Sequence, residues 1–375
     1  MKKLTMVMAC AVFVSVSAAA AAPAGTPPFG TIDYIEGEAS VVRKGKALGE
    51  PNIGDDIMPD DMIRTEADSI VIIALDRSTG MRGTLTIKPK TAAYIRLNPA
   101  TGGPRSSIDL ISGQIGSKLA KIAGSPSLQV NTDAVVMGVR GTAFTVTSSL
   151  RGSVLVVCTD GAVACTDGTD TIEVPAGKAA EKIEGKRFGS VPVAISSAAE
   201  FEKRWITDEI DAFKADAPRA LADYAKRYYD LLGRFSKAFD PVQRSPILSK
   251  WIREDSAGIV PPPNDPSVMK EKKELMADIL ETRKVLFMFE RIYYRILELE
   301  SIVSGTTTEK VVIAKGMTAG DFIRKVRSDA PGLDRRVFLF RYAEKLYEQR
   351  NAGGAGFPGM DSGDDFFNSS DDWDF

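Results

Sequence analysis

The chain of 375 residues contains no histidine and only three cysteines, Cys10, Cys158 and Cys165. Without histidine, it lacks histidine general bases, Ser-His-Asp and Cys-His nucleophiles and histidine-ligated zinc or iron sites. The cysteines are too few for a structural Cys₄ zinc site. No Gly-x-Gly-x-x-Gly motif follows a strand into a helix, and the Gly-x₄-Gly-Lys-Ser/Thr motif is missing. We therefore expect no metal, no cofactor and no catalytic residues of these types.

The N-terminal segment 1–22 has the composition of a secretory signal peptide. Lys2 and Lys3 precede an uncharged run, 4–16, and the segment ends in five alanines. A basic start, an apolar core and a small-residue cleavage zone define such signals. We therefore expect the mature chain to begin between Ala19 and Pro23 and the protein to be exported, to the periplasm or otherwise beyond the inner membrane.

Cys10 leaves a second form of export open. Val7-Met8-Ala9-Cys10 resembles a loose lipobox, but only residues 4–9 precede the cysteine as an apolar run. A lipid-anchored protein is therefore the less favoured alternative. The apolar stretch 4–22 would be long enough to span a bilayer if uncleaved, and no second run of about 18 uncharged apolar residues occurs in the chain.

Residues 28–190 have the pattern of a β domain. Short runs rich in valine, isoleucine and threonine alternate with turn signals such as Asn98-Pro99 and Thr101-Gly102-Gly103-Pro104. The central stretch 130–146 reads VNTDAVVMGVRGTAFTV, with β-branched residues on both sides of closely spaced glycines. Such a pattern predicts two short strands that meet at a kink.

The core of this stretch, MGVRGTAFTV, resembles the signature of the FecR domain family, a periplasmic β-rich module best known from iron-dicitrate transport regulators. The likeness extends over roughly residues 30–185, where Gly152–Val157 and Val174–Ala179 are similar to the closing elements of the family. It implies an all-β sandwich or β-roll without a catalytic motif. The residues that match the family core V-x-G-T-x-F-x-V are Val139, Gly141, Thr142 and Phe144.

The resemblance implies a noncatalytic binding or scaffolding function. An anti-sigma regulator of this family needs a cytoplasmic domain and a spanning helix. Because the chain has no second spanning run, we expect no cytoplasmic anti-sigma part and no sigma factor bound directly. The expected partner is an envelope protein or glycan, and the net charge of −2 gives no basic footprint for nucleic acid.

Four aspartates leave an enzymatic function open as the alternative. Asp55, Asp56, Asp60 and Asp61 cluster around two predicted turns, and paired carboxylates can perform acid/base chemistry. The alternative is a carboxylate-only enzyme that acts on an envelope glycan. Solvated turn carboxylates are the favoured interpretation, because aspartate commonly forms turns.

The resemblance also raises self-processing at Gly141-Thr142. Some anti-sigma members of the family break at a Gly-Thr bond, where a threonine hydroxyl can attack a strained preceding carbonyl. A purely structural role, with Gly141 at a bulge and Thr142 packed on a strand, is the favoured interpretation.

Cys158 and Cys165 flank a turn signal. A two-residue turn at Asp160-Gly161 would pair Cys158 with Val163 and Val156 with Cys165, which places both sulfur atoms on one face of a hairpin. A disulfide between them is one expectation, and two free buried thiols are the other.

Helical patterns follow in residues 196–254 and 267–350, separated by the proline-rich segment 255–266, which predicts a stiff linker. Ser197-Ala198-Ala199-Glu200 is a capping box that predicts one helix start, and Pro218 predicts another. The expected fold class is thus α+β and multidomain, with an all-β FecR-like domain, an α-helical domain and a tail.

One helix of about 50 Å is predicted over 269–304, because this segment is rich in helix formers and contains no Gly or Pro. Apolar residues recur at helical spacing on one face, which continues as a coiled-coil-like seam. An intramolecular bundle core is the favoured interpretation, and a homodimer seam is the alternative. The residues of this face are Leu275, Ile279, Leu286, Phe289, Tyr293 and Ile296.

The last predicted helix covers residues 334–350. It follows a strand-like run, 310–315, and a helix start at Thr318-Ala319-Gly320-Asp321. Acidic residues interleave with its cations, so we expect a solvated face. The cations are Arg335, Arg336, Arg341, Lys345 and Arg350.

The tail, 351–375, contains six aspartates, five aromatic residues and no Lys or Arg. It contributes a charge of −6 and leaves the rest of the chain at +4. Such a composition is typical of a disordered segment. The alternative is a short linear motif, in which the aromatic residues anchor and the aspartates steer toward a basic partner.

Overall fold

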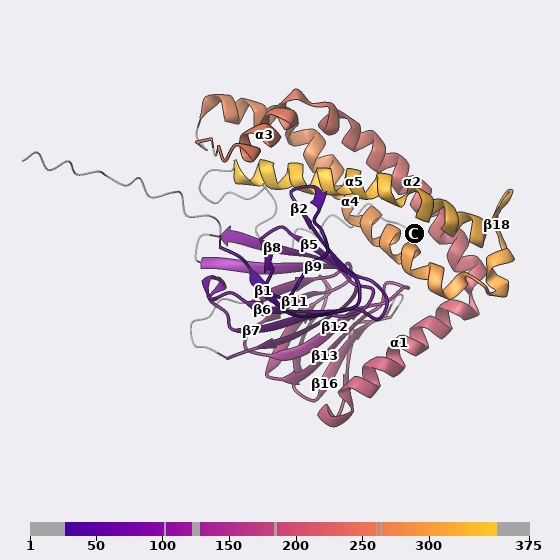
Figure 1. Cartoon of the computed structure of the whole chain (residues 1–375). Coiled ribbons are helices and arrows are strands. Elements are labelled where there is room, and N and C mark those ends of the chain that lie inside the picture. Colours follow the sequence, from indigo (N-terminus) through magenta and orange to yellow (C-terminus); the bar gives the residue numbers. More distant parts are fainter. Residues whose placement is uncertain are drawn as a thin grey trace, which may run out of the picture.

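The computed structural model describes residues 27–100, 103–121, 128–183, 186–259, 261–262 and 265–350. An N-terminal β region is followed by helices, which confirms the predicted fold class (Figure 1). The predicted signal peptide, Cys10 and the acidic tail lie outside the described residues. Among the described helices, no segment has the length and apolar character needed to cross a bilayer.

Two antiparallel sheets form the β region. Sheet A contains, in order across it, β4 (Asp56–Ile57), β1 (Gly30–Glu36), β6 (Ile70–Leu75), β7 (Gly83–Ile87), β9 (Gly103–Leu119), β12 (Ala143–Ser148), β13 (Val154–Asp160), β16 (Lys178–Lys182) and β17 (Gly189–Pro192). Sheet B contains β3 (Lys46–Ala47), β2 (Ala39–Arg43), β5 (Met62–Thr65), β8 (Ala92–Ala100), β9, β10 (Leu128–Asn131), β11 (Val136–Val139), β14 (Ala162–Thr166) and β15 (Thr171–Pro175), with β9 and β10 parallel.

Strand β9 belongs to both sheets and joins them. Its residues up to Ser112 pair with β8 and β10 in sheet B, whereas residues 113–119 pair with β7 and β12 in sheet A. Gly113 has a φ of 88°, and a Cβ atom there would lie 2.5 Å from the Lys90 carbonyl oxygen. Only glycine therefore fits the point where the chain changes sheets.

The part of sheet B formed by β2, β5 and β8 is buried on both faces, and alternate residues of each strand point to opposite sides. Ile63 and Ile95 point into the core between the two sheets, whereas Met62, Tyr94 and Val42 point away from it and pack against helices. The molecule therefore has a third, helical layer that shares a hydrophobic core with the β region.

The helical layer over sheet B consists of α2 (Ala217–Arg244), α4 (Pro266–Val303) and α5 (Ala319–Gln349) (Figure 1). Helix α1 (Ala198–Ala215) lies along sheet A instead, where Trp205 packs with Leu155 and Val157 of β13. The short elements are α3 (Pro246–Ser256), β18 (Val312–Ala314), β19 (Met317–Thr318) and the 3₁₀ turns η1 (Arg77–Thr79), η2 (Ile195–Ser197) and η3 (Thr307–Lys310).

Helix α4 is the center of the layer and contacts both α2 and α5. The six apolar residues predicted on one of its faces are all buried within the chain, as the intramolecular interpretation expects. A homodimer seam would therefore have to use other residues of this helix, such as Met269 and Met276, which are exposed.

Two predicted helix starts have different outcomes. The capping box at Ser197 is not formed, because η2 runs directly into α1 and the Ser197 hydroxyl donates to the Ala194 carbonyl at 3.1 Å. The start at Thr318 does form a capping box with Asp321. From there α5 continues through Pro331, because buried side chains on both sides of the proline outweigh its missing hydrogen bond.

Candidate functional site

The family core residues lie where the chain crosses between the sheets. Val139 ends β11 in sheet B and Phe144 lies in β12 of sheet A, and both are buried. Gly141 has a φ of 61°, and a Cβ atom there would lie 2.6 Å from the Lys121 Cα atom. The Thr142 hydroxyl is buried and has no hydrogen-bond partner. The glycine thus allows the crossing, and the kink predicted from the sequence is present.

The predicted cysteine hairpin is wrong. β13 pairs with β12 and β16, whereas β14 pairs with β11 and β15, so Gly161 is a second crossing between sheets rather than a hairpin turn. Cys158 and Cys165 therefore lie on strands of different sheets, where both are free and buried thiols. Burial raises the pKa of Cys165 to about 12.

Each of the four clustered aspartates has a partner of its own. Asp61 is buried and pairs with Arg43 at 2.7 Å, and Asp60 pairs with Lys345 at 3.0 Å. Asp55 accepts a hydrogen bond from the Asn52 backbone, and Asp56 accepts one from the Thr31 hydroxyl. These bonds hold turns and connect elements, which is a structural role. Within the described ranges, no group of three or more Cys, Asp or Glu side chains could hold a metal ion.

Of the five cations predicted on a solvated face of α5, only Arg335 is exposed, and the other four are paired. Arg341 pairs with the fully buried Glu290 of α4 and lies 4.6 Å above the ring of Tyr94 in β8. The Tyr94 hydroxyl also donates to Glu290, at 3.2 Å. Arg350 is buried and pairs with Glu254 at 2.7 Å. The Arg341 and Arg350 side chains therefore point toward the rest of the protein.

A second buried carboxylate, Glu344 of α5, lies close to the guanidinium groups of three arginines. Arg283 approaches it to 2.9 Å, Arg341 to 3.2 Å and Arg96 of β8 to 3.5 Å. Burial alone would raise the pKa of Glu344, but the three cations outweigh burial and hold this pKa at about 2. Arg96 also pairs with Asp109 of β9 at 2.8 Å.

Further pairs fix α4 and α5 on the strands. Arg295 of α4 pairs with Asp133 at 2.6 Å, and Arg64 of β5 pairs with Asp334 of α5 at 3.1 Å. Arg291 donates to the Phe287 carbonyl at 2.8 Å, and burial lowers its pKa to about 10. We call the ion pairs of Glu290, Glu344, Asp109, Asp133 and Asp334 with these arginines the interlayer ion network. One signal for it was present in the sequence: Arg291 and Arg295 lie in a stretch of α4 that is apolar on all sides, where charges must be buried.

A groove opens between the β2–β3 hairpin and α5, with a volume of about 400 Å³. Gly45 in the hairpin turn has a φ of 74°, and a Cβ atom there would lie 3.3 Å from the Phe338 carbonyl oxygen, so the hairpin and the helix approach closely. We call this cavity the hairpin groove. Its lining residues are Ser40, Val42, Gly45, Lys46, Ala47, Arg64, Pro331, Asp334, Arg335 and Phe338.

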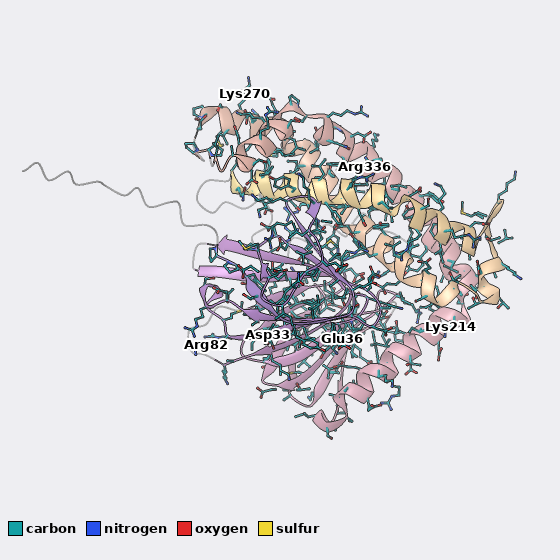
Figure 2. All side chains as sticks on the ribbon, viewed as in Figure 1. Asp33, Glu36, Arg82, Lys214, Lys270 and Arg336 are labelled. Carbon is teal, nitrogen blue, oxygen red and sulfur yellow. The ribbon has the colours of Figure 1, made fainter. Side chains whose placement is uncertain are left out.

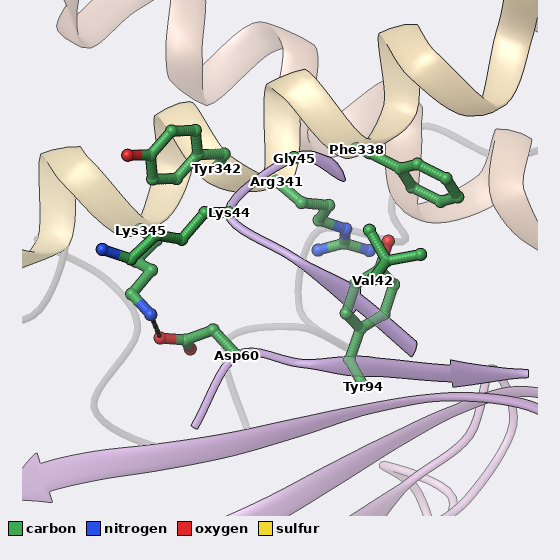
Figure 3. Close-up of a pocket in the computed structure, with 9 residues that line it drawn as sticks. All are labelled: Val42, Lys44, Gly45, Asp60, Tyr94, Phe338, Arg341, Tyr342 and Lys345. Carbon is green, nitrogen blue, oxygen red and sulfur yellow. Dashed lines mark ion pairs between the residues drawn. The ribbon is translucent and has the colours of Figure 1, made fainter. Parts of the chain in front are cut away.

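A smaller recess of about 20 Å³ shares Val42, Gly45 and Phe338 with the hairpin groove. Figure 3 shows it beneath α5, with Lys345 directed toward Asp60. This volume holds about one water molecule. The larger groove is therefore the part that can accept a ligand.

The charges of the hairpin groove are mostly positive. Arg64 is neutralised by Asp334, whereas Lys46 and Arg335 are exposed and have no ion-pair partner among the residues that the structure describes. The groove thus presents two available cations beside the apolar side chains of Val42 and Phe338. Sequence analysis did not identify this site, because it combines a hairpin and a helix that lie almost 300 residues apart.

The fold is that of a two-sheet β domain covered by a helical layer. Residues 61–164 match the family model described as FecR protein, so the chain contains a FecR domain, which confirms the resemblance seen in the sequence. The search of curated proteins finds no match.

Two solved structures of a candidate anti-sigma factor from Parabacteroides distasonis are similar to part of the chain. Both are 10% identical to it, with a TM-score of 0.32. The similar region covers 37% of this chain and 63% or 62% of those chains, less than two thirds of their length.

Proposed function

We propose that the protein is a noncatalytic, exported scaffold whose hairpin groove binds an extended segment of an envelope protein. The observation that carries the proposal is the groove itself, which combines apolar walls with two available cations at the junction of the β region and the helical layer. Binding sites in proteins commonly have volumes of about 300–1,000 Å³, lined by apolar side chains and a few polar groups.

The walls of the groove are held in place before a ligand binds. The Arg64–Asp334 pair links β5 to α5 within the groove, and Lys44, at the tip of the hairpin, pairs with Asp255 at 2.8 Å. A preformed site loses less conformational entropy on binding than a flexible one. The groove is therefore suited to a ligand with an apolar side chain and adjacent carboxylates.

A protein segment fits these walls better than a glycan does. A carboxylate in a peptide can pair with Lys46 or Arg335 while a neighbouring side chain occupies the space beside Phe338. The carboxylate-only enzyme has less support, because each of the four aspartates is engaged by its own structural partner.

The test is site-specific photo-crosslinking in intact cells. A photo-crosslinking amino acid replaces Ala47, an exposed residue of the groove, and in a control it replaces Lys270 of α4, on the outer side of the helical layer (Figure 2). We expect an envelope protein to crosslink from position 47 only. Once purified, this envelope protein should bind the Arg335→Glu variant about tenfold more weakly than the parent chain. Crosslinking to a glycan, or the same products from both positions, would refute the proposal.

A further inference from the structure

We propose that the hairpin groove is also the intramolecular binding site of this chain's own C-terminal segment, 351–375, which competes there with the envelope partner. The inference rests on the proposed function, because it requires the groove to bind peptides. Charge, side-chain chemistry and chain length each support this occupant over another.

Charge favours the C-terminal segment. It carries −6, whereas the rest of the chain carries +4. In the groove, Lys46 and Arg335 are exposed and available for carboxylates. Opposite charges of this kind accelerate association and select the orientation of the bound segment.

The side chains of the segment also suit the groove. Its aromatic residues are each within three positions of an aspartate, with the exception of Phe357. The groove offers the matching arrangement, in which apolar Val42 and Phe338 lie with the two cations in one cavity. Large aromatic side chains are the common anchors of such interfaces. The combination of an apolar side chain and adjacent carboxylates that we infer for an external partner is thus present in this segment of the chain.

The segment starts close enough to reach the groove. Helix α5 forms one wall through Pro331–Phe338 and ends at Gln349. The axial distance from Phe338 to Gln349 is about 16 Å at the helical rise per residue. Phe357, seven residues past Arg350, could extend about 23 Å, and the later aromatic residues could extend further. Every aromatic residue of the segment can therefore return to the groove.

Covalent attachment lowers the affinity that the segment needs. A segment attached to the same chain acts at an effective concentration of the order of 1 mM, so an intrinsic dissociation constant of about 1 mM would fill the groove half of the time. An external segment must then displace it. The C-terminal segment would act as an internal competitor that sets the threshold for partner binding.

The test uses the purified full chain with the photo-crosslinking amino acid at position 47. Position 82 is the control, because Arg82 is exposed and precedes β7 of sheet A, away from the helical layer (Figure 2). We expect a crosslink from position 47 to residues within 351–375, with a yield that does not change on dilution. The yield should fall about tenfold in Arg335→Glu and when the five aromatic residues of the segment are replaced by serine. Arg82→Glu, which reverses an exposed charge beside sheet A, should leave the yield unchanged.

Other outcomes overturn the inference. Equal yields from positions 47 and 82, or no crosslink to the segment, would show that the groove does not bind it. A yield that rises with protein concentration would assign the groove to a second copy of the chain. If position 47 captures an envelope protein in cells but not the segment in the purified chain, the proposed function stands and this inference fails. Capture of the segment alone would reject the external partner instead.

Discussion

Replacing Arg341 by methionine tests the interlayer ion network most directly. Arg341 is the main charged partner of Glu290, whose side chain is fully buried between α4, α5 and β8. Methionine has a similar length and fills the space above the Tyr94 ring, so the substitution removes the charge and its hydrogen bonds with little loss of volume. Glu290 would then be a buried carboxylate with only the Tyr94 hydroxyl as a hydrogen-bond donor.

The expected cost is about 3–5 kcal/mol in the free energy of unfolding, because breaking a buried pair leaves an uncompensated charge. Such a loss is a large share of the roughly 5–15 kcal/mol that stabilises a typical protein. Glu344 contributes little to this cost, since Arg283 and Arg96 continue to neutralise it. The double variant Glu290→Gln/Arg341→Met removes both charges and should recover most of the lost stability.

Urea unfolding followed by two independent probes measures these differences. Arg324→Met is the matched control, because Arg324 belongs to the same helix and pairs with Glu309 and Asp321 at an exposed site. Exposed pairs contribute at most about 1 kcal/mol. If Arg341→Met costs no more than Arg324→Met, or if the double variant is less stable than the single one, the network does not hold the layers together.

Four further predictions concern single groups. Burial raises the pKa of Glu298 to about 7, so the native state retains a proton that the unfolded chain loses, and stability falls as pH rises from 4.5 to 7. Glu298→Gln should therefore be more stable than the parent by roughly 3 kcal/mol at pH 8 and equal to it at pH 4, as measured by urea unfolding. Mass spectrometry after alkylation of the unreduced, denatured protein should find Cys158 and Cys165 both modified; a bonded pair would contradict the free thiols. Purified protein should run as one chain with or without Thr142→Ala, whereas two fragments that meet at Gly141 and Thr142 and disappear in the variant would show processing. N-terminal sequencing of the exported protein should start within residues 19–23, and a start at Met1 or a lipid on Cys10 would contradict cleavage there.

Local patterns in the sequence predicted local structure well. The glycines around Val139 indicated a kink between two strands, and the apolar spacing of 269–304 predicted a buried helix face, both of which the structure contains. Asp160-Gly161 shows where local patterns fail. The dipeptide is a favourable hairpin turn, but β13 pairs with β12 and β16 in sheet A, whereas β14 pairs with β11 and β15 in sheet B. The chain therefore crosses between the sheets at this point.

The charged residues of α5 also show that local sequence patterns cannot identify partners on other elements. Interleaved acids and bases look identical in sequence whether water or a buried partner satisfies them. The partners of Arg341 and Arg96 are Glu290 and Glu344, which lie on other elements, and neither pairing has a sequence spacing that could identify it. The hairpin groove was not predicted for the same reason, because its walls are joined by Arg64–Asp334 and Lys44–Asp255, pairs that lie more than 200 residues apart in the sequence.

The ion network explains how the groove forms between the β region and the helical layer. Without the helical layer, Met62, Tyr94 and Ile111 would form an apolar outer face of sheet B, interrupted by the charged side chains of Arg64 and Arg96. Apolar packing alone would allow the helices to slide on such a face, because the hydrophobic effect has no direction. Pairs with fixed geometry, such as Arg64–Asp334, allow one register, and this register sets the distance between α5 and the β2–β3 hairpin. The width of the groove therefore depends on the ion pairs that fix α5 on sheet B, one of which, Arg64–Asp334, lines the groove itself.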